Sequence, residues 1–171
     1  MPTRQVDSPR IVTQQLRLTL DQPVRRDVKV ESMGTWGTGP FEDDSALDFV
    51  DHLRTLPADE VAVELERAVR SVAEEEDYIE YSAGVSAVAA ATLLSGQYRD
   101  DLQEWPAGIP TLTPELAGLA LRAIERAHSD GSHLWELWTE SGKYGEVRKS
   151  LAPVQAGLLG AANPVQPDSL F

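Results

Sequence analysis

The sequence predicts an all-α protein, a single compact bundle of about five or six helices. Apolar residues recur at helical spacing in several segments, and these segments begin and end at capping and helix-breaking residues. One segment, Ala83–Leu94, is almost wholly small and apolar, as a helix buried on all sides is. A chain of 171 residues is long enough for one domain with a substantial core and too short for two.

The first predicted helix follows a glycine-rich lead-in over residues 33–41. Asp43 or Asp44 is a suitable N-cap, and Pro57 ends the helix. A second helix follows, for which Asp59 is the predicted cap. The expected inward stripes are Ala46, Phe49, Val50, Leu53 and Leu56 in the first helix, and Val61, Leu65, Ala68, Val69 and Val72 in the second.

The segment Ala83–Leu94 is the predicted central helix, because its small side chains let neighbouring helices approach closely. A long connection then leads to a helix that starts at Thr113, with Pro114 at its first position. The inward stripe expected there is Leu116, Ala120, Ala123, Ile124 and Ala127. Ser132 is the predicted cap of a short fifth helix, and Tyr144–Leu159 is the predicted last helix.

The two ends of the chain are expected to differ from this bundle. Leu16–Leu20 alternates with period two, so residues 1–32 are either a short β-hairpin or a disordered extension. The domain itself is expected to begin at Met33 and to cover residues 33–159. Residues 160–171, which are rich in proline and small residues, are expected to form a flexible tail.

Charge is distributed unevenly along the chain. Residues 1–32 carry six Lys/Arg and four Asp/Glu, whereas the remaining residues carry nine and 24, a net charge of −15. So acidic a surface disfavours nucleic acid and anionic membranes as partners. It serves solubility alone, or it binds a basic protein partner. The absence of cysteine excludes thiolate metal sites and fits a cytoplasmic location, and no apolar stretch is long enough for a membrane span.

Gly34, Gly37 and Gly39 suggest a phosphate-binding loop, but their spacing is G-x-x-G-x-G and no Lys-Ser/Thr pair follows them. The acidic residues that follow would also repel a phosphate. We therefore expect the lead-in to be structural, with Trp36 and Phe41 buried.

Three carboxylates, Asp44, Asp48 and Asp51, share one helix face and are candidate ligands for Mg²⁺ or Ca²⁺. With His52 beside them, a metal-dependent or acid–base enzyme that uses Asp44, Asp48 and His52 is the alternative function. His128 and His133 flank a Ser-Asp-Gly-Ser turn, but residues this close in sequence are weak evidence for a catalytic triad. No cofactor and no catalytic residue is assigned.

The chain has few aromatic residues, and three of them are the tryptophans Trp105, Trp135 and Trp138. They either fill the core or serve as partner-binding anchors, a role in which tryptophan is enriched.

The segment from Met33 to Phe49, which reads MGTWGTGPFEDDSALDF, resembles the opening of the bacterial domain-of-unknown-function family 4259. Leu134–Ser141 is similar to a later element of that family, and the resemblance covers roughly residues 33–155. It implies a small bacterial helical domain and no activity, cofactor or partner. The leading functional hypothesis is a non-enzymatic, acidic interaction protein, with an inhibitory or immunity-like role as one form of it.

Overall fold

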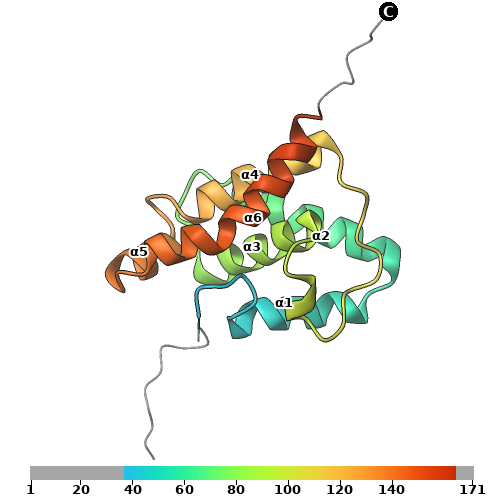
Figure 1. The fold of residues 1–171 in the computed structure, drawn as a ribbon, viewed down its shortest axis with the longest axis horizontal. Helices are drawn as coiled ribbons and strands as arrows, with labels where there is room; N and C mark the ends of the chain where they lie inside the picture. Colours follow the sequence, from blue (N-terminus) through green and yellow to red (C-terminus); the bar gives the residue numbers. More distant parts are fainter. Residues whose placement is uncertain (1–36, 165–171) are drawn as a thin grey trace, which may run out of the picture. The chain divides into compact units, whose positions relative to one another are not determined.

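The computed structural model describes residues 37–164, which form a bundle of six α-helices (Figure 1). The helices are α1 (Asp44–Thr55), α2 (Ala58–Ala73), α3 (Tyr81–Ser95), α4 (Pro114–Ala127), α5 (His133–Glu140) and α6 (Tyr144–Ala162), and a short 3₁₀ turn, η1 (Arg99–Asp101), lies between α3 and α4. The described residues contain no β-strand, only an isolated bridge between Ile79 and Ser132. The predicted all-α bundle is confirmed. The predictions for residues 1–32, Met33 and Trp36 fall outside the described residues.

Helix α3 is the centre of the bundle, as predicted from its composition. Every other α-helix packs against it, and Figure 1 shows it in the middle of the described fold. All residues from Ala87 to Leu94 are buried. A Cβ added at Gly84 would come within 3.0 Å of a Leu134 methyl carbon, so the glycine allows α5 to lie close against α3.

The helix starts follow the predicted capping residues in two cases. The Asp43 carboxylate accepts the backbone N–H groups of Ser45 at 2.8 Å and Ala46 at 3.3 Å, which caps α1. The Thr113 hydroxyl accepts the N–H of Leu116 at 3.2 Å, and Pro114 follows it as the first residue of α4.

Two other residues predicted as caps make no capping hydrogen bond, and one of them, Asp59, does not occupy the cap position. Asp59 does not cap α2, because the helix begins one residue earlier, at Ala58, and Pro57 occupies the cap position without a side-chain hydrogen bond. The proline ring fixes φ near the value that a helix start requires, so no side-chain acceptor is needed to define it. Ser132 does precede α5, but its buried hydroxyl donates to the carbonyl of Ala127 and leaves the α5 amides uncapped.

The last helix is longer than predicted and runs to Ala162, three residues beyond Leu159. Pro153 lies inside it on the exposed side, where the missing backbone N–H costs one hydrogen bond but no packing. The buried residues Val147, Leu151, Val154 and Leu158 continue on both sides of the proline. Burial of this stripe against the core therefore carries the helix through a residue that usually interrupts one.

The remaining core predictions are mostly confirmed. The inward stripes predicted for α1, α2 and α4 are buried, apart from Leu56 and Leu116, which are half-buried against the core. Phe41 is 4% exposed, as expected for the lead-in. None of the described helices combines the length and the apolar character needed to cross a membrane.

Candidate partner-binding surface

Acidic side chains are concentrated in α1, α2 and the segment up to α3, which we call the acidic surface. Arg126 of α4 also lies beside this group and donates to the main-chain carbonyls of Glu75 and Asp77. Residues 42–80 contain 14 Asp/Glu and three arginines. Each arginine is already held by a carboxylate of its own helix or the residue just after it: Arg54 by Asp51, Arg67 by Glu64, and Arg70 by Glu66 and Glu74. Nine other acidic residues of this segment are exposed, namely Glu42, Asp44, Asp48, Asp59, Glu60, Glu75, Glu76, Asp77 and Glu80.

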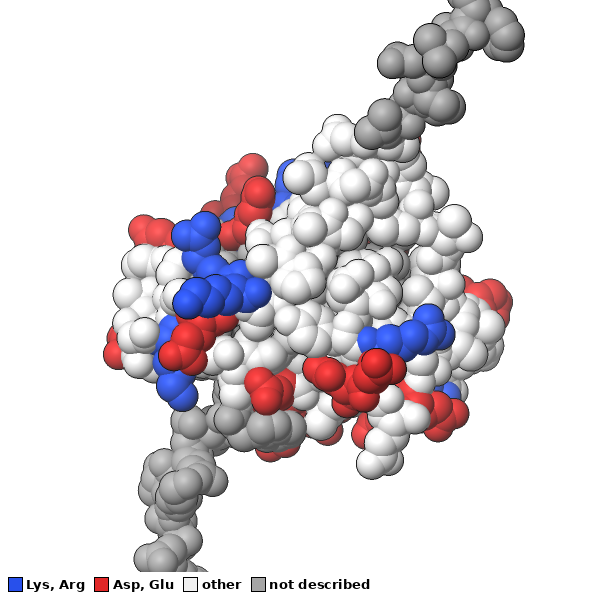
Figure 2. All heavy atoms as spheres, viewed as in Figure 1, with Lys and Arg blue, Asp and Glu red and all other residues white. Residues whose placement is uncertain are grey.

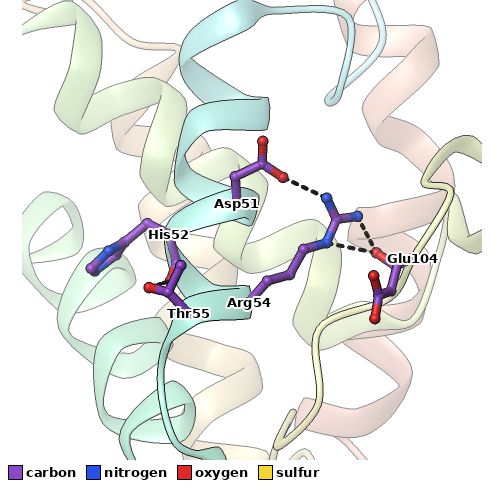
Figure 3. Close-up of polar contacts among 5 residues, drawn as sticks. All are labelled: Asp51, His52, Arg54, Thr55 and Glu104. Carbon is purple, nitrogen blue, oxygen red and sulfur yellow. Dashed lines mark hydrogen bonds and ion pairs between the residues drawn. The ribbon is translucent and has the colours of Figure 1, made fainter.

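The long connection between α3 and α4, residues 96–113, is fastened to the corner where α1 meets α2. Arg54 donates from Nε to the main-chain carbonyl of Glu104 at 3.0 Å and from a second nitrogen to Asp51 at 2.5 Å (Figure 3). Gly108 passes so close to α2 that an added Cβ would lie 2.2 Å from the carbonyl oxygen of Ala58. The connection therefore adds its own exposed carboxylates, Asp100, Asp101 and Glu104, to the acidic surface. In Figure 2 the charged side chains along the α1 edge of the visible face are mostly Asp and Glu, drawn in red.

Trp105 lies in this connection and lines an open cleft of about 550 Å³. The cleft is bounded on one side by the last turn of α3, from Leu93 to Gly96, and on the other by Pro106–Ile109. The guanidinium carbon of Arg99 lies 4.9 Å from the centre of the Trp105 ring, which is a cation–π contact. The indole is half-buried and packs against the core, so the ring has a fixed position.

Tyr98 fixes the start of the same connection. It has a positive φ of 57°, an uncommon conformation for a residue with a side chain. Its hydroxyl donates to the main-chain carbonyl of Ser150 in α6. Burial, followed by the nearby Asp101 and Glu42, raises the pKa of Tyr98, so the hydroxyl remains a donor at neutral pH. The tyrosine thereby holds η1, and with it Arg99, in place.

The structure does not bring the residues of the alternative enzymatic site together. Asp44, Asp48 and His52 are all exposed, and Asp51 is engaged by Arg54. Figure 3 shows the His52 ring directed away from Asp51, on the other side of α1. Among the described residues no group of three or more His, Cys, Asp or Glu side chains is arranged to hold a metal ion.

The other two tryptophans lie on α5 and are half-buried. Trp138 borders a small cavity of about 40 Å³ together with Gly39, Pro40 and Asp43. The cavity has room for a few water molecules at most. The two segments on which the family resemblance rests therefore meet here, although they are almost a hundred residues apart. Asp43, besides capping α1, accepts a hydrogen bond from the Tyr81 hydroxyl.

The two histidines near the turn after α4 have separate environments. His128 is buried, borders the same cavity and shares a hydrogen at Nδ1 with the carbonyl of Ile124, 3.0 Å away. Because a carbonyl only accepts, Nδ1 is the donor in this pair. Burial lowers the pKa of His128, so its neutral form is favoured. His133 is exposed and lies edge-on to the Tyr81 ring, with centroids 5.4 Å apart.

The contacts that define the acidic surface and its cleft were not foreseen from sequence. Arg54 and Glu104 are fifty residues apart, and their link uses a main-chain carbonyl, which any residue could supply. Arg99 and Trp105 are close in sequence but lie in an irregular segment without periodicity. The one feature of the sequence that could have indicated the cation–π contact was a basic residue near a tryptophan in a long connection.

A family model described as "Domain of unknown function (DUF4259)" matches residues 34–150. The chain belongs to the DUF4259 family. No curated protein and no solved structure matches it significantly. The DUF4259 match includes α1 to α5, the connection with Trp105 and the first turns of α6, so the acidic surface and the cleft lie within the family domain.

Proposed function

We propose that this DUF4259 protein is a non-enzymatic interaction protein that binds a basic protein partner through the carboxylates of α1, α2 and the connection 96–113. One observation carries the proposal: the three arginines of residues 42–80 are already held by nearby carboxylates, which leaves nine exposed acidic side chains there without an ion pair among the described residues. A surface of this kind attracts cationic partners and accelerates their association.

The uneven distribution of charge favours this function over solubility alone. Residues 42–80 have a net charge of −11, from 14 acidic and three basic side chains. In contrast, residues 143–164 have three basic side chains and one acidic side chain. Solubility requires charge but does not require that its sign be segregated. An inhibitory or immunity-like role fits this surface, because it would cover a basic site that the partner uses for an anionic ligand.

The test is affinity capture from cell lysate with the full chain and two variants of equal charge. The first variant neutralises the acidic surface: Asp44→Asn, Asp48→Asn, Asp59→Asn and Glu60→Gln. The control neutralises four exposed carboxylates elsewhere, Glu115→Gln, Glu125→Gln, Asp130→Asn and Glu140→Gln. The first set removes three first-turn carboxylates, Asp44, Asp59 and Glu60, and the control removes one, Glu115, so the first variant loses more helix-dipole stabilisation and the folding of both is checked by circular dichroism.

We expect the wild-type chain and the control to capture the same basic proteins at low salt, and the first variant to lose them. Purified captured protein should then bind the wild-type chain with an affinity that falls as salt rises, because exposed charges are screened. Equal binding of that protein by both variants would overturn the proposal. So would the recovery of no basic protein by the wild-type chain.

A further inference from the structure

We infer that the Trp105 cleft anchors a single cationic side chain, an arginine or a lysine, of the basic partner. This inference rests on the proposed function and assigns the cleft a specific ligand chemistry. It is carried by three features: an aromatic face that already holds a guanidinium, main-chain carbonyls at the end of α3, and the exposed carboxylates of the connection that contains Trp105.

The aromatic face is that of Trp105. The Arg99 guanidinium lies 4.9 Å from the ring centre, which shows that this face is accessible to a cation in the folded protein. Arg99 is itself exposed and makes no ion pair within the described part of the chain. Because the indole is packed against the core, little side-chain entropy remains to be lost when a ligand binds to it.

The C-terminal turn of α3 supplies hydrogen-bond acceptors. Leu94 and Ser95 line the cleft, and their carbonyls accept no hydrogen bond from any described residue. The carbonyls at a helix C-terminus carry partial negative charge, which favours a cationic donor. Gly96 ends the helix with a φ of 69°, and there is no atom within 4 Å of the position a Cβ would take. The space beside Gly96 is therefore open, while the Ser95 carbonyl oxygen lies next to Gly157 of α6, 3.7 Å from the position a Cβ would take there.

The remaining walls and rim suit a long basic side chain. Ile109 and Leu112 line the cleft and can contact the aliphatic stem of an arginine or lysine. Asp100, Asp101 and Glu104 are exposed in the same connection and add negative charge near the cleft. Among the described residues that line the cleft, Arg99 alone is charged, so a cation that enters the cleft has to take the place of Arg99 at the ring or share the ring with it.

Arg99 has a defined part in this arrangement, as an internal competitor for the ring. An incoming cation must displace the Arg99 guanidinium from Trp105 or share the ring with it. Removal of the Arg99 charge should therefore strengthen the binding of an external cation. A cation–π contact that only stabilises the fold would give no such gain.

The experiment is an NMR titration of the full ¹⁵N-labelled chain with the peptide acetyl-Gly-Arg-Gly-amide. The matched probe replaces arginine with citrulline, which has nearly the same shape and no charge. The indole signal of Trp105 is identified from the Trp105→Phe variant. We expect the arginine peptide to shift this signal and the amides of Ser95 and Gly96, and the citrulline peptide to leave them unchanged. Arg99→Gln should bind the arginine peptide about two- to five-fold more tightly, the range of an exposed cation–π contact.

Equal shifts with both peptides, no shift of the Trp105 indole, or unchanged or weaker binding by Arg99→Gln would each overturn the inference. Arg99→Lys keeps the charge and should bind like the wild type, which separates the loss of charge from a change in the turn. Failure here is distinguishable from failure of the proposed function. If capture depends on the α1–α2 carboxylates while the arginine peptide leaves Trp105 unaffected, the acidic surface stands and the anchor site is rejected.

Discussion

The Arg54 guanidinium at the end of α1 donates to the main-chain carbonyl of Glu104, fifty residues further along the chain. The same group holds Asp51, so one side chain joins α1 to the connection that carries Trp105 (Figure 3). Arg54 thereby links the end of α1 to the segment that contains Trp105. Substitution of Arg54 should consequently weaken the packing of the connection against α1.

Arg54→Gln should lower the free energy of unfolding by about 1–2 kcal/mol, because hydrogen bonds from a charged donor to the Glu104 carbonyl and Asp51 are lost. Amide hydrogen exchange should accelerate over residues 100–108. The control is Arg67→Gln, which removes an exposed contact within α2 and should cost about 0.5 kcal/mol or less. Urea unfolding and exchange mass spectrometry measure both effects, and equal losses in the two variants would contradict the coupling.

Gly108→Ala should be more damaging than its size suggests. Its φ of 82° is unfavourable for alanine, and the new Cβ would lie 2.2 Å from the Ala58 carbonyl oxygen, which cannot move without α2. Together these effects should cost about 2–4 kcal/mol. Gly142→Ala is the control for backbone strain alone, because Gly142 has a φ of 70° with open space around it. This substitution should lower the free energy of unfolding by about 1 kcal/mol. Similar melting temperatures for the two variants would show that the connection does not press on α2.

The cap of α1 and the Tyr81 hydroxyl share one carboxylate, so their substitutions should be coupled. Tyr81→Phe removes one hydrogen bond to Asp43 and should cost about 1–2 kcal/mol. Asp43→Ala also loses the bonds to the Ser45 and Ala46 amides and should cost about 2–3 kcal/mol. The double variant should be less unstable than the sum of the two, as measured by denaturant unfolding. Strict additivity would mean that the shared hydrogen bond contributes nothing.

His128 should make the fold sensitive to mild acid. Its pKa in the folded protein is below the ordinary 6.5 because burial disfavours the charged ring. The unfolded chain therefore binds the proton more readily, so the stability is fully present above about pH 6.5 and is lost as the pH falls below it. The loss is at most about 1.4 kcal/mol per pH unit.

The test for His128 compares unfolding of the wild type and His128→Asn between pH 7.5 and 5.5. The asparagine amide can still donate to the Ile124 carbonyl but does not titrate. The wild type should lose more stability than the variant over this range. Parallel curves would mean that other groups account for any acid sensitivity.

Much of the fold could be predicted from the sequence because its signals are local. The capping roles of Asp43 and Thr113 depend on a few adjacent residues. The burial of α3 follows from its own composition. One error arose where two local rules competed, because Pro57 fixed the start of α2 before Asp59 could cap it. The predicted end of α6, Leu159, was three residues short of the observed end at Ala162.

The candidate site was less predictable, since its residues are joined by tertiary contacts. Trp105 was identified as a possible anchor by residue type alone, and nothing in the sequence linked it to the corner of α1 and α2. Asp44 and Asp48 were correctly placed on one helix face, but a shared face does not give convergence, and both are exposed. Only the path of the connection, fixed by Arg54 and Gly108, brings the acidic and aromatic parts together.

The central position of α3 has a consequence for how the protein unfolds. Each of the other five α-helices packs on it, so removal of α3 would take core contacts from all of them, although α4 also packs against α2 and α6. Unfolding should therefore be cooperative, without a partly folded form that keeps the acidic surface alone. A fragment that contained only α1 and α2 would have the charge but neither the α3 carbonyls nor Trp105. Recognition would then be an all-or-none property of the intact bundle.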